Sequence, residues 1–198
     1  MGLIGMYIEN MIIYMIVALP FYIVFRIIFI KRKQKQVKVL NEIILAIFTI
    51  YIIALASQTI IPQWDFGRMS ETGKFYFDVN ITNDLAKVNL IPFKTLYQYL
   101  FQTNAHVDSW SAVSLLNITG NILLFSPIGF VVPLFWTHWR SFKKMLLLGL
   151  AITCFIEVTQ LFIGRSTDID DVILNTVGVL LGYGIFRLFK INRTAREN

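Results

Sequence analysis

The sequence has few of the features that mark soluble enzymes. It contains one cysteine, Cys154, so no disulfide can form within the chain. It contains neither a glycine-rich phosphate-binding loop nor the motif that surrounds the nucleophilic serine of many hydrolases. No internal repeat or low-complexity segment is visible. These absences argue against a disulfide-stabilised scaffold, a nucleotide-binding domain and a serine hydrolase.

Charged residues are also scarce. They make up 15% of the 198 residues, against about 25% in soluble domains, and 56% of the residues are hydrophobic. Apolar runs of about 20 residues are long enough to cross a bilayer as helices. The predicted fold class is an all-α, polytopic helical membrane protein with one domain, residues 1–198. Its five predicted spans are Met11–Ile30, Ile43–Ile61, Leu115–Trp136, Met145–Ile163 and Val172–Ile191.

The positive charges are grouped along the chain. Basic residues fill the connection 31–38, the connection 140–144 and the segment 187–196, whereas the other connections are acidic or mixed. This alternation follows the positive-inside rule. It predicts an amino terminus outside the membrane and a carboxyl terminus inside. It also explains the net charge of +6 without a nucleic-acid partner.

The longest connection, Pro62–Ser114, lies outside in this topology. Its first half is polar and glycine-containing, which predicts a solvated loop. Its second half carries apolar residues at the spacing of one helical face. These residues are Phe93, Leu96, Tyr97, Leu100 and Phe101. We expect an amphipathic helix in the outer interface of the bilayer. The alternative is a short helix packed over the bundle.

Polar side chains occur inside the predicted spans, where they are costly and indicate a functional site. Glu157 and Gln160 lie in the fourth span, Asn117 and Asn121 in the third, and Asn175 in the fifth. From the predicted span ends, Glu157 and Asn121 lie roughly 9 Å below the outer boundary, and Asn175 about 5–6 Å. This common depth predicts a polar pocket open to the outer leaflet. The amides could instead be hydrogen-bond links between helices.

A charged loop joins the fourth and fifth spans. It contains Arg165, Asp168, Asp170 and Asp171. Arg165 could form a structural ion pair with Glu157, or both could face a wet pocket. The aspartates could cap the fifth span. They are also weak candidates for a divalent-cation site, although their spacing matches no known metal motif. No metal and no cofactor is predicted.

One face of the fifth span is polar at its loop end and smooth further along. Asp171, Asn175, Gly178 and Gly182 follow one another at intervals of 4, 3 and 4 residues, so they share a helical face. Glycines allow two helix backbones to come close together. We therefore expect a neighbouring helix to pack closely along this face.

The motifs in the second half of the chain resemble the VanZ-like family of bacterial membrane proteins. They are Asn89-Leu90-Ile91-Pro92-Phe93, the run from Asn121 to Gly129, and Glu157-x-x-Gln160 followed by Arg165, Asp168, Asp171, Asn175 and Gly178. They fall within residues 89–190. The resemblance implies a small multi-spanning bundle in the bacterial cell membrane. The name-giving member is associated with reduced susceptibility to the lipoglycopeptide teicoplanin, and the resemblance implies no catalytic role.

The favoured hypothesis is recognition of an amphiphilic molecule at the outer leaflet, either a lipid-linked envelope precursor or a lipoglycopeptide. Such recognition would lower susceptibility to lipoglycopeptides, which makes antibiotic resistance the expected role. The predicted ligand-binding residues are Asn117, Asn121, Glu157, Gln160, Arg165, Asp168, Asp171 and Asn175. The predicted acyl-chain contacts are Phe93, Leu96, Tyr97 and Leu100.

Two other classes of function compete with this hypothesis. One is a membrane hydrolase or transferase acting on a lipid-linked substrate, with Glu157 as catalytic base and the aspartates holding a metal. The other is a transporter, but transporters tend to show inverted repeats and polar residues at the midplane. A regulatory partner of another membrane protein is a further alternative.

Overall fold

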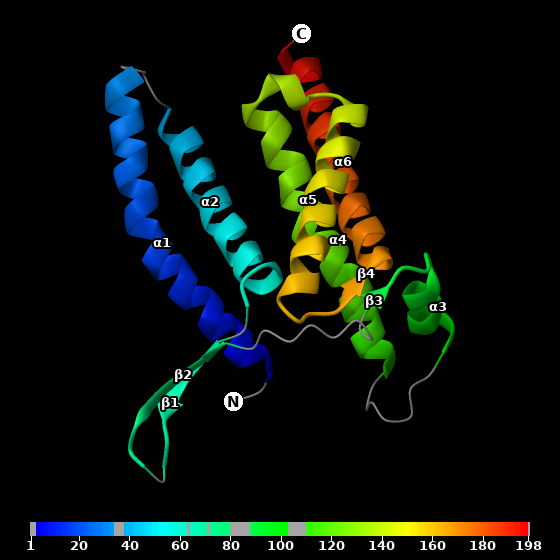
Figure 1. The fold of residues 1–198 in the computed structure, drawn as a ribbon. Helices are drawn as coiled ribbons and strands as arrows, with labels where there is room; N and C mark the ends of the chain where they lie inside the picture. Colours follow the sequence, from blue (N-terminus) through cyan, green and yellow to red (C-terminus); the bar gives the residue numbers. More distant parts are fainter. Residues whose placement is uncertain are drawn as a thin grey trace. The chain divides into compact units, whose positions relative to one another are not determined.

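The computed structural model describes residues 3–33, 38–62, 64–70, 72–79, 88–102 and 110–197. The chain divides into two compact units, Met1–Ile61 and Pro62–Asn198, which are treated separately below. The first unit is a pair of helices. The second contains the remaining helices, a hairpin and a short parallel strand pair (Figure 1).

Five helices are long and apolar enough to cross a membrane, as the composition predicts. Their spanning parts are Met11–Arg32, Val39–Thr59, Val113–Phe135, Phe142–Phe162 and Ile169–Lys190. The helices themselves are α1 (Leu3–Lys33), α2 (Val39–Thr59), α4 (Trp110–Phe135), α5 (Phe142–Phe162) and α6 (Ile169–Glu197). The largest correction concerns α2, which begins at Val39 and not at Ile43. Glu42 is therefore part of a membrane-spanning helix.

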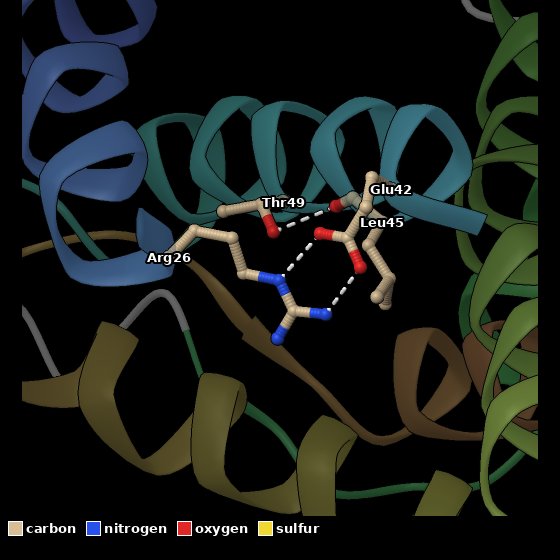
Figure 2. Close-up of polar contacts among 4 residues, drawn as sticks. All are labelled: Arg26, Glu42, Leu45 and Thr49. Atoms are coloured by element: carbon tan, nitrogen blue, oxygen red, sulfur yellow. Dashed lines mark hydrogen bonds and ion pairs between the residues drawn. The ribbon is translucent and has the colours of Figure 1, made fainter. Parts of the chain in front are cut away.

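The first unit contains an ion pair between its two helices. Arg26 of α1 donates through Nε to Glu42 Oε2 at 2.6 Å and through Nη2 to Oε1 at 2.7 Å (Figure 2). The hydroxyl of Thr49 donates to the carbonyl of Leu45 in its own helix, at 2.8 Å. A two-point contact of this kind fixes the relative rotation of two side chains as well as their distance. The pair therefore sets the register of α1 against α2.

Replacement of Glu42 by glutamine is expected to destabilise the first unit by several kcal/mol, because Arg26 then keeps a charge without a partner in an apolar setting. The variant with both Arg26→Gln and Glu42→Gln is expected to recover much of this loss. Thermal unfolding in nanodiscs measures both effects. Ile47→Val serves as the control, because the Ile47 side chain of α2 is exposed, and it should change little. Equal losses in the single and double variants would refute a coupled pair.

The second unit is built around three spans. In Figure 1, α4, α5 and α6 lie side by side as the green, yellow and orange-red helices. The contacts between α4 and α6 follow the same order along both helices. They pair Ile122 with Gly178, Ser126 with Gly182 and Gly129 with Tyr183. The helices α4 and α6 therefore run parallel, and α5 returns between them in the sequence. This is the alternation of direction that five successive crossings require.

The glycine face of α6 packs against the backbone of α4, as the spacing predicts. A Cβ atom added to Gly182 would lie 1.9 Å from the carbonyl oxygen of Ser126, and one added to Gly178 would lie 2.4 Å from that of Ile122. From the opposite side, Gly129 of α4 faces the carbonyl of Val179 at 1.8 Å on the same measure. Only residues without a side chain fit at these positions. The close packing predicted for this face is confirmed.

The core of the second unit combines apolar side chains with buried hydroxyls. Phe125, Ile128, Met145 and Val179 are fully buried. Between α5 and α6, the hydroxyls of Thr153 and Thr176 lie 3.3 Å apart, and Thr153 also donates to the carbonyl of Gly149 in its own helix. A hydroxyl buried in this way satisfies its donor within the helix. The contact of Thr153 with Thr176 thus joins α5 to α6 without an unpaired hydroxyl.

Short strands accompany the helices. β1 (Trp64–Arg68) and β2 (Phe75–Val79) pair antiparallel, where the sequence analysis predicted a loop. β3 (Val88–Asn89) pairs in parallel with β4 (Thr167–Asp168). The short helices are α3 (Lys94–Phe101) and the 3₁₀ turn η2 (Thr137–Trp139). The fold remains mainly helical, so the predicted fold class is correct.

Candidate functional site

The polar residues of the second unit meet where β3 and β4 pair. The pairing places Asn89 beside Asp168. One carboxylate oxygen of Asp168 accepts hydrogen bonds from Asn89 Nδ2 at 3.0 Å and from the backbone N–H of Asp170 at 2.9 Å. The other accepts from the hydroxyl of Thr95 at 2.5 Å. Asp168 therefore ties the segment before α3 to the start of α6.

Asp170 holds the beginning of α3. Its side chain is 1% exposed, and its two oxygens accept the backbone N–H groups of Phe93 at 2.5 Å and Leu96 at 3.0 Å. These are N–H groups that a helix cannot satisfy at its own first turn. A carboxylate also interacts favourably with the positive end of a helix dipole. Asp170 is thus a helix cap supplied by a distant helix. Of the two aspartates predicted to cap the fifth span, Asp168 is the one that does so, because it precedes α6 and its Oδ1 accepts the N–H of Asp170.

Phe93 is strained at this junction. Its φ of 65° places a bulky residue in the left-handed region, where a side chain is disfavoured. Its ring is exposed, while its N–H is held by Asp170. Strain that persists because of surrounding contacts is typical of functional sites. The contact with Asp170 accounts for how the conformation is maintained.

Glu157 lies in the last turns of α5 and is buried against the same junction. Its Oε2 accepts the backbone N–H of Asp168 at 2.8 Å, and its carbonyl accepts the hydroxyl of Thr167 at 3.2 Å. The carboxylate therefore fixes the position of β4 relative to α5. Glu157 therefore lies next to the acidic loop, as expected from its position near the end of the helix that precedes this loop.

Asp171 and Asn175 face α4. Asp171 Oδ1 accepts a hydrogen bond from Asn121 Nδ2 at 2.6 Å. Asn175, one turn further along the same face, is only 4% exposed, and its Oδ1 has no hydrogen-bond donor among the described residues. A buried polar atom without a partner is rare and requires a cause such as a water molecule or a ligand. This oxygen is the one open acceptor within the buried part of the cluster that the structure describes.

Arg165 does not pair with Glu157 in the part of the chain that the structure describes. The helix α5 ends at Phe162, and Gly164 turns the chain with a φ of 73°. The backbone N–H of Arg165 donates to the carbonyl of Gln160 at 3.1 Å. The side chain of Arg165 is half-buried. The ion pair considered from the sequence is therefore absent from the described contacts, and Arg165 contributes a positive charge whose field reaches Glu157.

Asn117 does not join the cluster. Its side chain is exposed and donates to the carbonyl of Val113 in its own helix at 2.9 Å. Gln160 is half-buried, and its carbonyl accepts the N–H groups of Ile163 and Arg165 at the end of α5. Of the predicted ligand-binding residues, the structure brings together Asn121, Glu157, Asp168, Asp171 and Asn175 at one end of the bundle.

The helix α3 carries an exposed apolar face. Phe93, Tyr97, Leu100 and Phe101 are exposed, and Leu96 is half-buried. The other side of α3 contacts the bundle, where the hydroxyl of Ser114 donates to the carbonyl of Tyr99. Burial, and then the charges of Asp171 and Asp168, raise the pKa of the Tyr99 phenol. The alternative of a short helix packed over the bundle is therefore confirmed for one side of α3. The exposed apolar side is what an interface helix requires, and its contact with the bilayer stays a prediction.

The aspartates are weak metal ligands in this arrangement. The described residues contain no group of three His, Cys, Asp or Glu side chains that could hold a metal ion. Asp168 and Asp170 each direct both oxygens to donors of the protein itself. A cation would have to share those oxygens with the donors. The geometry favours a role for Asp168 and Asp170 in positioning α3.

Three residues that complete the cluster are not among the predicted site residues. They are Asn89, Thr95 and Thr167. Asn89 lies in the Asn89–Phe93 motif, but Thr95 and Thr167 resemble ordinary loop or helix-start residues. Their partners lie far away in the chain: Thr95 and Asn89 bind Asp168, which is 73 and 79 positions distant. The signal available in the sequence was the spacing of Asn89 and Thr95, an amide and a hydroxyl six residues apart that hydrogen-bond to each other.

The fold and the cluster define a multi-pass helical membrane protein with a polar site at one end of its bundle. A family model described as VanZ/LLP1 matches residues 48–190, so the chain belongs to the VanZ/LLP1 family. The resemblance noted from the motifs is thereby confirmed. Comparisons with the curated proteins and with the solved structures gave no match. The family is linked in general to teicoplanin resistance.

Proposed function

We propose that this protein recognises an amphiphilic or lipid-linked ligand at the outer leaflet of the bacterial cell membrane and lowers susceptibility to lipoglycopeptides such as teicoplanin. One observation carries the proposal. Asp168 and Asp170 hold an exposed apolar helix directly beside a polar cluster. An amphiphile presents the same two surfaces in the same order, an acyl chain next to a polar group.

The polar end of the ligand would meet acceptor atoms. Asn175 Oδ1 lacks a donor among the described residues. The carboxylate of Asp171 accepts from Asn121 Nδ2, and that of Glu157 accepts from the backbone N–H of Asp168. Hydroxyl or amine groups of a ligand are the matching donors. Arg165 offers the complementary charge for an anionic group. The acyl chain would lie along Phe93, Tyr97 and Leu100, with Leu96 at its edge.

The charge distribution supports the outer side of the membrane. The cluster lies where α5 ends and α6 begins. The basic residues of the segment 140–144 lie at the other end of α5, where that helix begins. Basic connections favour the cytoplasmic side. The cluster then opens to the outer leaflet, with the amino terminus outside and the carboxyl terminus inside. We treat the two units as parts of one membrane domain, residues 1–198.

An enzyme acting on a lipid-linked substrate has less support. Glu157 would be its catalytic base, but its Oε2 already accepts the N–H of Asp168. The oxygens of Asp168 and Asp170 are engaged with donors of the protein. Such groups are more useful for holding a shape than for transferring protons. Recognition without bond cleavage is therefore the function that the cluster supports best.

The apolar face of α3 is expected to provide most of the affinity for an acylated ligand. The variant with Tyr97→Ala and Leu100→Ala should bind teicoplanin at least about tenfold more weakly, since each lost contact removes about 1.5 kcal/mol or more and 1.4 kcal/mol is a factor of ten. Titration of the purified protein in nanodiscs measures this change. Bacteria expressing the variant should regain susceptibility to teicoplanin.

Two controls make the result specific. The variant with Leu123→Ala and Leu147→Ala removes similarly exposed side chains from the spans and should bind normally. A glycopeptide without an acyl chain should bind the native protein weakly and should not distinguish the variants. Unchanged teicoplanin affinity in the α3 variant, with normal folding, would reject the proposed recognition surface.

A further inference from the structure

The hairpin formed by β1 and β2 has two different faces. Its register pairs Arg68 with Phe75 and Gly67 with Tyr76, and its turn is closed by the Met69 N–H donating to the carbonyl of Lys74 at 2.9 Å. Successive side chains of a strand point to opposite faces. Phe75, Phe77 and Val79 therefore share one face of β2, whereas Tyr76 and Asp78 share the other.

The first of these faces is apolar and exposed. Phe75 is 72% exposed and Phe77 66% exposed, and Val79 is exposed as well. On the opposite face, the ring of Tyr76 lies across Gly67, because a Cβ atom added to Gly67 would lie 2.8 Å from that ring. The aromatic residue on the second face is thus covered by its own hairpin, while the rings on the first face keep most of their surface exposed.

A cation completes the apolar face. The guanidinium of Arg68 lies 5.7 Å from the centre of the Phe75 ring, and its Nε donates to the carbonyl of Gly73 at 2.6 Å. Aromatic residues beside arginine are typical of the headgroup region of a bilayer, where rings lie at the apolar boundary and cations meet phosphates. This combination fits a lipid surface better than an apolar protein groove.

The covalent connection keeps the hairpin near such a surface. The spanning helix α2 ends at Thr59 and β1 begins at Trp64, so four residues separate them. The five Cα–Cα steps from Thr59 to Trp64 extend over at most about 18 Å. The headgroup region on each side of a bilayer is about 5–8 Å thick. The hairpin therefore begins within or just beyond the headgroups, and β2 can reach them.

We infer that the β1–β2 hairpin is a membrane-interface element whose Phe75, Phe77 and Val79 face inserts into the bilayer at the side where α2 ends. Its partner is the lipid surface. This inference is independent of the ligand proposed for the polar cluster. It adds a second membrane contact outside the spans and assigns a role to a segment that the polar site does not use.

Alternating positions on β2 provide the test. In a Cys154→Ser background, single cysteines replace Phe75, Tyr76, Phe77 or Asp78 and carry an environment-sensitive NBD fluorophore. The proteins are reconstituted in vesicles of phosphatidylcholine and phosphatidylglycerol. Probes at 75 and 77 should show blue-shifted emission and quenching by spin-labelled lipid. Probes at 76 and 78 should be quenched by aqueous iodide instead.

The unsubstituted protein provides a second measurement, which does not depend on how the labelled variants fold. A photoactivatable lipid should form adducts on Phe75 and Phe77 and fewer on Tyr76 and Asp78, as read by mass spectrometry. Iodide quenching at all four positions, or lipid quenching without alternation, would overturn the inference. A benzophenone attached to the cysteine at position 77 would also overturn it by cross-linking two copies of the chain, because the face would then be a protein interface.

Discussion

Replacement of Asp170 by alanine is expected to lower the free energy of unfolding of the second unit by about 3 to 6 kcal/mol, because two hydrogen bonds to a charged group are lost at about 1.5–3 kcal/mol each. The N–H groups of Phe93 and Leu96 would be left without their acceptors. The left-handed conformation of Phe93 would lose the contact that maintains it. The helix α3 should then separate from the bundle, and teicoplanin binding should fall with it.

The effect can be located with hydrogen exchange. In the Asp170→Ala protein, the amides of Phe93 and Leu96 should exchange much faster than in the native protein, while amides in the middle of α5 should not change. Asp170→Asn keeps one acceptor oxygen, so its exchange rates at Phe93 and Leu96 should lie between those of the native and Asp170→Ala proteins. Asp78→Ala removes an exposed carboxylate and should alter stability by no more than about 0.5 kcal/mol. Unchanged exchange at Phe93 and Leu96 would show that Asp170 does not hold α3.

Replacement of Gly182 by alanine is expected to disrupt the packing of α4 against α6. The added Cβ atom would lie 1.9 Å from the carbonyl oxygen of Ser126, whereas a carbon and an oxygen in contact normally stay about 3.3 Å apart. The obstacle is backbone, so no side chain can rotate away. Overpacking usually costs 1–3 kcal/mol, and we expect about 3 kcal/mol or more here. Thermal unfolding in nanodiscs measures the loss.

Gly184 is the matched control in the same helix. A Cβ atom there meets nothing within 4 Å. Gly184→Ala should leave stability unchanged or raise it by up to about 1 kcal/mol, since alanine favours helix more than glycine does. Both variants add one methyl group two residues apart, so they differ only in what that group meets. Similar melting temperatures for the two would rule out close contact at Gly182.

The spans and their polar residues could be predicted because each depends on a short stretch of chain. Hydropathy and length identified five spanning helices, and helical spacing placed Asp171, Asn175, Gly178 and Gly182 on one face. The family resemblance also followed from short motifs. These properties require no knowledge of which distant segments meet.

The contacts that position the site could not be predicted in this way. Asp170 looked like the cap of its own helix, but it caps α3, 74 positions earlier. Short strands such as β3 and β4 carry no periodic pattern, so nothing local indicates that Asn89 lies beside Asp168. The pair of Arg26 and Glu42 was missed for another reason: the predicted second span began after Glu42, which removed it from the membrane.

The hairpin could have been found from the sequence. Phe75, Phe77 and Val79 alternate with Tyr76 and Asp78, which is the period of a strand with two different faces. The glycine and polar residues nearby outweighed this alternation and favoured a loop. Asp65, Gly67 and Arg68 lie in β1 itself, whereas Ser70, Thr72 and Gly73 lie in the turn between the strands.

The parallel contact of α4 with α6 also affects how the protein is made. The last residue of α4 is Phe135 and the first of α6 is Ile169, so 34 positions of chain separate them. At about 5–20 residues per second, a ribosome needs about 2–7 seconds for that distance. During this interval Asn121 has no Asp171 to bind, and the backbone groove beside Gly129 is empty of its partner. The contact between the two helices can form only when α6 leaves the insertion machinery, so α4 must wait in the membrane with a polar side chain and a backbone groove that nothing in its own hairpin with α5 is shown to cover.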